Sequence, residues 1–219
     1  MIEVLIVDDQ PLMAKALKVF VDGSEGMTVV GEASDGAEAI RQAEILSPDV
    51  VVMDMQMPVM DGVEATRIIT RDLPKARVLA VTTFSSEQYL VPALRAGASG
   101  YLVKDAEPEE VVAAIRGVYE GSGVIAPQVA SDLIDAVREV STGPLQPGGL
   151  VEHGLTEREL AVVLSLARGN SNSEIAAELF LAEATVKTHM GRIMDKWGVR
   201  DRVQVLIHAA QLGLVRIGV

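Results

Sequence analysis

The chain of 219 residues is 49% hydrophobic, 23% charged and 3% aromatic, and it contains no cysteine. Its length suits one large domain or two small ones, each with a hydrophobic core, and excludes a peptide-like fold. Without cysteine, structural disulfides, cysteine-ligated zinc, iron–sulfur clusters and thiol catalysis are excluded. The low aromatic content argues against a surface that stacks on sugars or on bases.

The same inspection predicts where the protein resides. The absence of cysteine favours a reducing compartment. Every apolar run is shorter than the roughly 18 residues that a membrane span requires, and the N-terminus begins with a predicted strand rather than a basic segment. We therefore expect a soluble, cytoplasmic protein with no membrane partner.

The formal net charge of −12 is unevenly distributed along the chain. Residues 1–120 carry 10 Lys/Arg and 20 Asp/Glu, whereas residues 151–219 carry 8 of each. Within the second segment, residues 185–202 have five basic side chains and two acidic ones. Because this segment is locally basic, the acidic total does not exclude nucleic acid as a partner.

In the first 120 residues, short apolar runs rich in β-branched residues alternate with helical segments. Such runs are typical of strands buried on both faces of a parallel sheet. Strands are predicted at residues 4–7, 28–30, 50–53, 78–81 and 101–103. Helices are predicted at residues 11–21, 37–46, 63–72, 88–96 and 108–119. Five βα units predict an α/β domain with a doubly wound, five-stranded parallel sheet, the flavodoxin-like arrangement.

Residues 121–153 have the composition of a linker. Residues 127–140 repeat apolar side chains at helical spacing and begin with a proline, which predicts one more helix. Residues 141–149 form a Pro/Gly tract that does not hold regular structure. We therefore predict domains at 1–120 and 154–219.

The segment 154–219 is helical throughout. Capping boxes begin at Thr156 and Ser171, and glycines follow the predicted ends of the helices. These signals predict helices from 156 to about 168, from 171 to about 179, from 183 to 197 and from 202 to 212. Four short helices make a small all-α domain, and the short second connection is typical of a helix-turn-helix.

Polar side chains follow four of the predicted strands: Asp8 and Asp9, then Asp54, Thr82 and Lys104. The carboxyl ends of parallel strands meet at one edge of the sheet, so these groups are expected in one crevice. Clustered carboxylates repel one another unless a cation neutralises them, and oxygen ligands alone select a hard ion such as Mg²⁺. The set suits attack of a carboxylate on a phosphoryl group, with Asp54 as the nucleophile. For each residue singly, helix capping is the alternative explanation.

The predicted helix 183–197 has one apolar face and one polar face. Lys187, Thr188 and Arg192 lie on the polar face and are predicted to contact DNA in a major groove, with Lys196 on a phosphate. The alternative is an ordinary solvated helix face.

Motifs in both halves resemble a known family. In the first half, the motifs of a response-regulator receiver domain are Ile6–Asp9, Asp54–Pro58 with Asp61–Gly62, Val81–Thr83 and Gly97–Asp105. In the second half, those of a LuxR-type helix-turn-helix are Leu155–Glu159, Glu174–Ala176 and Thr185–His189. Together they resemble the NarL/FixJ subfamily of bacterial two-component regulators over nearly the whole chain except the linker.

This resemblance implies a phosphorylation-controlled transcription factor rather than an enzyme. Asp54 would accept phosphate from the phosphohistidine of a sensor kinase. Asp9, Asp54 and the backbone carbonyl of Gln56 would hold Mg²⁺, and Asp8 would assist through water.

The resemblance also implies the parts of the switch. Lys104 would contact the phosphoryl oxygens, Thr82 would turn its hydroxyl onto the phosphate, and Tyr101 would follow as the aromatic switch. An ordinary strand aromatic is the alternative for Tyr101. Residues 202–212 would pair two DNA-binding units on promoter DNA as a homodimer, although core packing alone also explains their apolar character.

Two other functions fit part of the pattern. A Mg²⁺-dependent phosphatase with an aspartyl nucleophile also places Asp at a strand end, but Asp54-Met55-Gln56 lacks the second Asp that the common aspartate phosphatases use as acid and base. A regulator that works without phosphorylation would keep the fold, and the intact polar set argues against it.

The chain departs from the family pattern at two positions of the predicted recognition helix. Ala182 stands where the family commonly has Ser or Thr, so a cap worth about 1 kcal/mol is missing. Gly191 stands where some relatives carry a DNA-contacting side chain. It lowers helix propensity by up to about 1 kcal/mol and permits a close approach to the backbone.

Overall fold

The computed structural model describes residues 1–83, 87–122 and 153–215. Two compact units, Met1–Gly123 and Val124–Val219, make up the chain. The predicted linker helix at 127–140 and the Pro/Gly tract at 141–149 lie outside the described residues.

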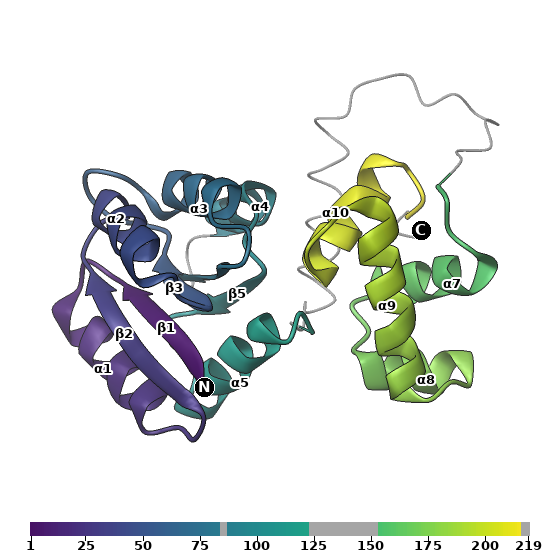
Figure 1. Cartoon of the computed structure of the whole chain (residues 1–219), viewed down its shortest axis with the longest axis horizontal. Coiled ribbons are helices and arrows are strands. Elements are labelled where there is room, and N and C mark those ends of the chain that lie inside the picture. Colours follow the sequence, from purple (N-terminus) through teal and green to yellow (C-terminus); the bar gives the residue numbers. More distant parts are fainter. Residues whose placement is uncertain (84–86, 123–152, 216–219) are drawn as a thin grey trace. The chain divides into compact units, whose positions relative to one another are not determined.

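The first unit contains the predicted five-stranded parallel sheet, with strand order β2-β1-β3-β4-β5 (Figure 1). The strands are β1 (Ile2–Val7), β2 (Met27–Ala33), β3 (Val50–Asp54), β4 (Arg77–Thr82) and β5 (Gly100–Val103). The order reverses beside β1, so the crevice at the carboxyl ends of β1 and β3 is the point where such sheets bind ligands.

Five helices cover the sheet: α1 (Pro11–Asp22), α2 (Gly36–Leu46), α3 (Gly62–Asp72), α4 (Glu87–Ala96) and α5 (Pro108–Tyr119). Helices α1 and α5 lie on one face, and α2, α3 and α4 lie on the other (Figure 1). Because both faces are covered, the middle residues of the central strands are apolar. All five residues of β3 are buried.

Strand β2 is longer than predicted. The apolar run covers only residues 28–30, but pairing with β1 continues to Ala33 through a register shift between Val4 and Leu5. At the edge of the sheet, the half-buried Gly31 and the exposed Glu32 remain compatible with a strand, although they break the apolar pattern.

The second unit contains four short helices, as predicted: α7 (Glu157–Leu166), α8 (Asn172–Leu179), α9 (Glu183–Trp197) and α10 (Arg202–Gln211). Both predicted capping boxes are present, at Thr156 and Ser171. Ala182 provides no side-chain cap for α9, as expected from its residue type. Three residues separate α8 from α9, which is the short connection of a helix-turn-helix.

The core of the second unit is formed by the apolar faces of all four helices. Its fully buried side chains include Val162, Leu166, Ile175, Val186, Ile193 and Leu206. The apolar residues of α10 are themselves buried, so their abundance alone does not indicate a dimer interface. Among the described residues, no helix is long and apolar enough to cross a membrane.

Candidate functional site

Three carboxylates gather at the carboxyl ends of β1 and β3, as predicted. Asp8 and Asp9 follow β1, and Asp54 is the last residue of β3. Each offers an oxygen within 4.8 Å of the others. Asp8 and Asp54 are buried, whereas Asp9 is exposed. Of the three carboxylates, only Asp9 is therefore open to solvent.

Lys104 joins this cluster from the end of β5. Its Nζ lies 2.7 Å from Asp54 Oδ2 and 2.8 Å from Asp8 Oδ2. The Lys104 side chain is only 7% exposed. A buried ammonium thus lies between two buried carboxylates, and the backbone N–H of Gln56 donates to Asp54 Oδ1 at 3.0 Å.

Burial and charge act against each other on these groups. Burial raises the pKa of Asp54, and the hydrogen bonds from Lys104 and Gln56 only partly counteract it. Burial alone would lower the pKa of Lys104, but the hydrogen bonds and charges of Asp54 and Asp8 outweigh burial and raise it. In number, three carboxylates still face one ammonium group at this site.

The donor set fits a magnesium ion. Asp8, Asp9 and Asp54 supply only oxygen ligands, and no described His lies in the cluster. Their charge exceeds that of the one ammonium group beside them, so a hard divalent cation would relieve the repulsion. The predicted carbonyl ligand, Gln56, lies in the loop after β3, two residues beyond Asp54.

Thr82 ends β4, the strand between those of Asp54 and Lys104. Asp54 pairs in register with Val81, so Thr82 lies one residue beyond the level of Asp54. Thr82 is fully buried, and its hydroxyl has no hydrogen-bond partner in the described part of the chain. Leaving a buried hydroxyl without a partner costs about 1–3 kcal/mol.

Tyr101 lies half-buried on β5, and it pairs in register with Ala80. Ala80 and Thr82 are two residues apart on one strand, so their side chains point to the same face of the sheet. Tyr101 and Thr82 therefore lie on the same face of the sheet, which a movement of Tyr101 in response to Thr82 would require. Thr83 donates a hydrogen bond to Gln56 Oε1 at 3.4 Å, which joins the loops after β3 and β4.

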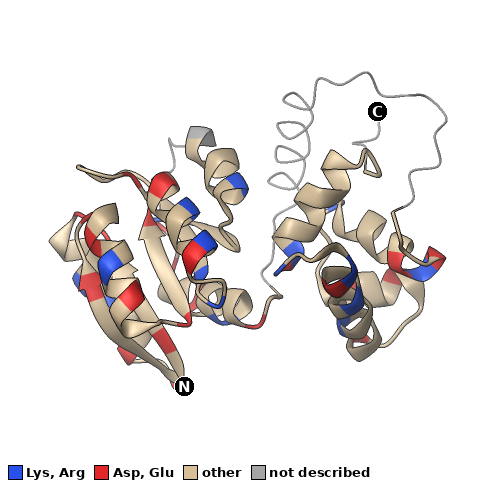
Figure 2. Cartoon of the chain, turned by 45° about the horizontal axis from the view of Figure 1, so that its top comes forward, with Lys and Arg blue, Asp and Glu red and all other residues tan. Residues whose placement is uncertain are grey.

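The polar face of α9 carries three of the four predicted DNA contacts. Lys187, Thr188 and Arg192 are exposed, and basic residues gather along this helix in Figure 2. Lys187 lies 3.5 Å from Glu183 on the preceding turn, and the Thr188 hydroxyl donates to the carbonyl of Ala184 at 2.9 Å. The opposite face holds the buried Val186, Met190 and Ile193.

Lys196, the predicted phosphate contact, has partners within the second unit. Its ammonium group lies 2.6 Å from Glu159 Oε2 and donates to the carbonyl of Gly154 at 3.1 Å. Burial raises the pKa of Glu159, but hydrogen bonds from Lys196 and Thr156 outweigh burial and lower it to about 2. Lys196 thus ties α9 to the start of α7, and its contact with a DNA phosphate stays a prediction.

Two features of the second unit were not predicted. Phe180, in the turn between α8 and α9, is 95% exposed and has a left-handed backbone with φ of 55°. Trp197 donates to the carbonyl of His153 at 2.9 Å, and its ring centroid lies 4.8 Å from that of His208. Neither the exposure of Phe180 nor the pairing of distant residues has a signal in the local sequence.

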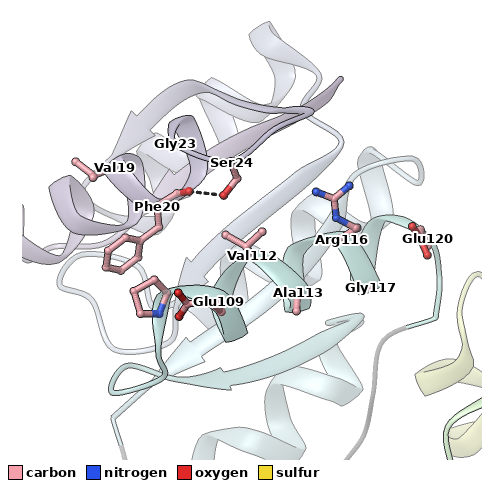
Figure 3. A pocket seen from close by; sticks show the side chains of 11 residues that line it. Val19, Phe20, Gly23, Ser24, Glu109, Val112, Ala113, Arg116, Gly117 and Glu120 are labelled. Carbon is pink, nitrogen blue, oxygen red and sulfur yellow. Dashed lines mark hydrogen bonds between the residues drawn. The ribbon is translucent and has the colours of Figure 1, made fainter.

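A pocket of about 650 Å³ lies between α1 and α5 (Figure 3). Val19, Phe20 and Val112 give it an apolar wall, and Glu109 and Arg116 lie along α5. None of the predicted site residues lines it. The acidic cluster, with its convergent charged groups, is therefore the better candidate for phosphoryl chemistry.

Both units match family models. Residues 4–116 match the response regulator receiver domain, and residues 153–209 match the bacterial regulatory proteins of the luxR family. The chain belongs to the response-regulator family. It is a DNA-binding response regulator of the NarL/LuxR type, as the motifs predicted.

Individual relatives of this response regulator match it over almost the whole chain. The uncharacterized transcriptional regulatory protein YxjL of Bacillus subtilis is 38% identical, with 98% of each chain covered. The transcriptional regulatory protein LiaR of the same organism is 37% identical, with 98% of this chain and 100% of LiaR covered. These names favour a regulator over the alternative of an aspartyl phosphatase.

A solved structure is similar over the same length. The response regulator ChrA of a heme-sensing two-component system is 36% identical, with 98% of each chain covered and a TM-score of 0.51. The receiver domain of NarL from Mycobacterium tuberculosis covers 55% of the response regulator with a TM-score of 0.53. The flavodoxin-like receiver and the helical C-terminal domain are thus those of the family.

Proposed function

We propose that phosphorylation of Asp54 switches this response regulator between two states of promoter binding. The receiver comprises residues 1–120, the linker 121–153 and the DNA-binding domain 154–219. A sensor histidine kinase donates the phosphoryl group, and the phosphorylated chain binds DNA as a homodimer in the cytoplasm.

The observation that carries this proposal is the environment of Asp54. A buried carboxylate with a raised pKa lies beside Lys104, and the Thr82 hydroxyl on the adjacent strand has no partner among the described residues. An added phosphoryl group brings three acceptor oxygens and one to two negative charges. It would give Lys104 a stronger hydrogen-bond partner than a carboxylate, and it would give the Thr82 hydroxyl a partner.

In the transfer step, a carboxylate oxygen of Asp54 attacks the phosphorus. The bond from phosphorus to the donor imidazole breaks as the new oxygen–phosphorus bond forms, and the imidazole nitrogen keeps the electron pair. Lys104 holds the phosphoryl oxygens and orients them. Mg²⁺, held by Asp9, Asp54 and the carbonyl of Gln56 with Asp8 nearby, would neutralise the negative charge that gathers at the site.

Relaxation of the site then alters the surface of the receiver. Thr82 rotates its hydroxyl onto the phosphoryl group, which relieves the cost of its present burial. Tyr101, on the same face of the sheet, moves into the space that Thr82 leaves. We assign DNA contacts to Lys187, Thr188 and Arg192 on α9, and a phosphate contact to Lys196.

Phosphorylation by a small donor tests the proposal. The full chain is incubated with acetyl phosphate and Mg²⁺, and intact mass and sedimentation are measured. We expect the wild type to gain one phosphoryl group and shift toward a dimer. Asp54→Ala should gain none, whereas Asp72→Ala, at an exposed carboxylate on α3, should behave as the wild type. A folded wild type that gains no mass would leave the phosphorylation-independent regulator as the function.

A further inference from the structure

Gly191 occupies a position where a helix ordinarily avoids glycine. It lies in the interior of α9, eight residues after the first residue of the helix. After proline, glycine is the residue that lowers helix stability most, because the unfolded chain has more freedom to lose. A glycine here therefore needs a reason that outweighs its effect on the helix.

The described part of the chain supplies no such reason. A Cβ atom built at Gly191 meets no heavy atom within 4 Å, and its φ is not positive. Two glycines of the receiver differ in this respect. A Cβ at Gly62 would lie 2.0 Å from the carbonyl oxygen of Asp54, and one at Gly36 would lie 2.8 Å from Met60. Those two are required by packing, whereas Gly191 is not.

The open space lies on the polar side of α9. Thr188 precedes Gly191 by three residues and Lys187 by four, so both occupy the adjoining turn of the same helix face. Arg192 follows directly, and all three of these side chains are exposed. Gly191 therefore forms a gap in the surface that carries the proposed DNA contacts.

We infer that an edge of a base pair in bound duplex DNA approaches the backbone of α9 at Gly191, so that the absence of a side chain helps to set which sequence binds. This inference rests on the proposed function. A base edge fits better than a phosphate because the gap lies between side chains on the groove-facing turns, and contacts at that depth report sequence.

The inference predicts opposite signs for stability and for affinity. Gly191→Ala should raise the urea midpoint, because alanine favours the helix and its Cβ meets no heavy atom of the described residues within 4 Å. The same methyl group should weaken binding to the preferred sequence about tenfold, which is the effect of one mismatched base contact. Binding to unrelated sequence should be unchanged, because no phosphate contact is lost.

The experiment uses the full chain phosphorylated with acetyl phosphate. Wild-type protein first selects a duplex from a random-sequence pool. Affinities for this duplex and for a scrambled duplex of the same composition are then measured by fluorescence anisotropy at one salt concentration. Trp197, the only tryptophan of the chain, reports unfolding of the C-terminal unit.

A second variant separates affinity from stability. Ala177→Gly, at an exposed position of α8, should lower stability without altering the preference between the two duplexes. When Gly191→Ala and Ala177→Gly are combined, the stability should return toward the wild-type value. The tenfold loss of affinity for the selected duplex should persist. Repeating the selection with Gly191→Ala should return a changed base at one or two positions.

Three results would overturn the inference. These are unchanged affinity of Gly191→Ala for the selected duplex, equal weakening on both duplexes, and a lower urea midpoint. Each of them leaves DNA binding by the wild type intact. If the wild type selects no sequence at all, the proposed function fails, and the role of Gly191 fails with it.

Discussion

Lys104 Nζ lies 2.7 Å from Asp54 Oδ2, although 50 residues separate them in the chain. The contact forms because β3 and β5 both pair with β4, so their carboxyl ends meet at one edge. Asp8, on the far side, lies 2.8 Å from the same ammonium group. One cation thus holds together the ends of three parallel strands.

Removing this cation should destabilise the receiver. Lys104→Met leaves Asp8 and Asp54 buried without their partner, and we expect a loss of about 3 kcal/mol in the free energy of unfolding at pH 7. Urea unfolding followed by circular dichroism measures it. Lys18→Met removes an exposed pair with Glu32 and should leave the midpoint unchanged. Equal midpoints for all three proteins would show that the buried pair does not hold the strand ends.

Thr82 and Thr66 offer a matched test of the switch, because both have buried hydroxyls without a partner among the described residues. Replacing either by valine should raise the free energy of unfolding of the unphosphorylated chain by about 1 kcal/mol. Only Thr82→Val should lose the shift toward dimer that acetyl phosphate causes, as measured by sedimentation. A normal dimer shift in Thr82→Val would remove this hydroxyl from the mechanism.

Glu159 should make the stability of the DNA-binding domain depend on pH. Its pKa of about 2 lies below the ordinary 4.5, so its contribution is complete above pH 4.5 and is lost as the pH falls toward 2. This difference in pKa corresponds to a contribution of about 3 kcal/mol at most to the free energy of unfolding. Trp197 fluorescence in urea at pH 7 and at pH 3 measures it. Glu159→Gln should flatten this profile, whereas Glu157→Gln, at an exposed position of the same helix, should keep it.

Lys196 and Lys187 should have opposite effects, although both lie on α9. Lys196→Ala removes the partner of buried Glu159 and should cost about 2 kcal/mol of stability, less than for a fully buried pair because Lys196 is 37% exposed. Lys187→Ala should leave stability unchanged and reduce the salt dependence of DNA binding by about one ion. The reverse pattern would favour Lys196 over Lys187 as the phosphate contact.

Much of the fold and the receiver site could be predicted because they depend on short-range patterns. Apolar runs at regular intervals predicted the five strands, and the polar residues after them predicted the acidic cluster. Capping boxes at Thr156 and Ser171 predicted where α7 and α8 begin. In each case a few adjacent residues are enough for the prediction. The polar residues after the strands come together because the strands are parallel and their carboxyl ends lie at one edge of the sheet.

What only the tertiary structure decided depends on residues far apart in the chain. The partner of Lys196 is Glu159, 37 residues earlier, and no local pattern indicates that pairing. The buried hydroxyl of Thr82 and the open space beside Gly191 likewise depend on which elements pack nearby and which do not. The sequence by itself determined the elements and the family, and it predicted the role of Asp54. The packing decided which charged groups stabilise the chain and which remain available to a partner, because burial and distance arise only when the elements are assembled.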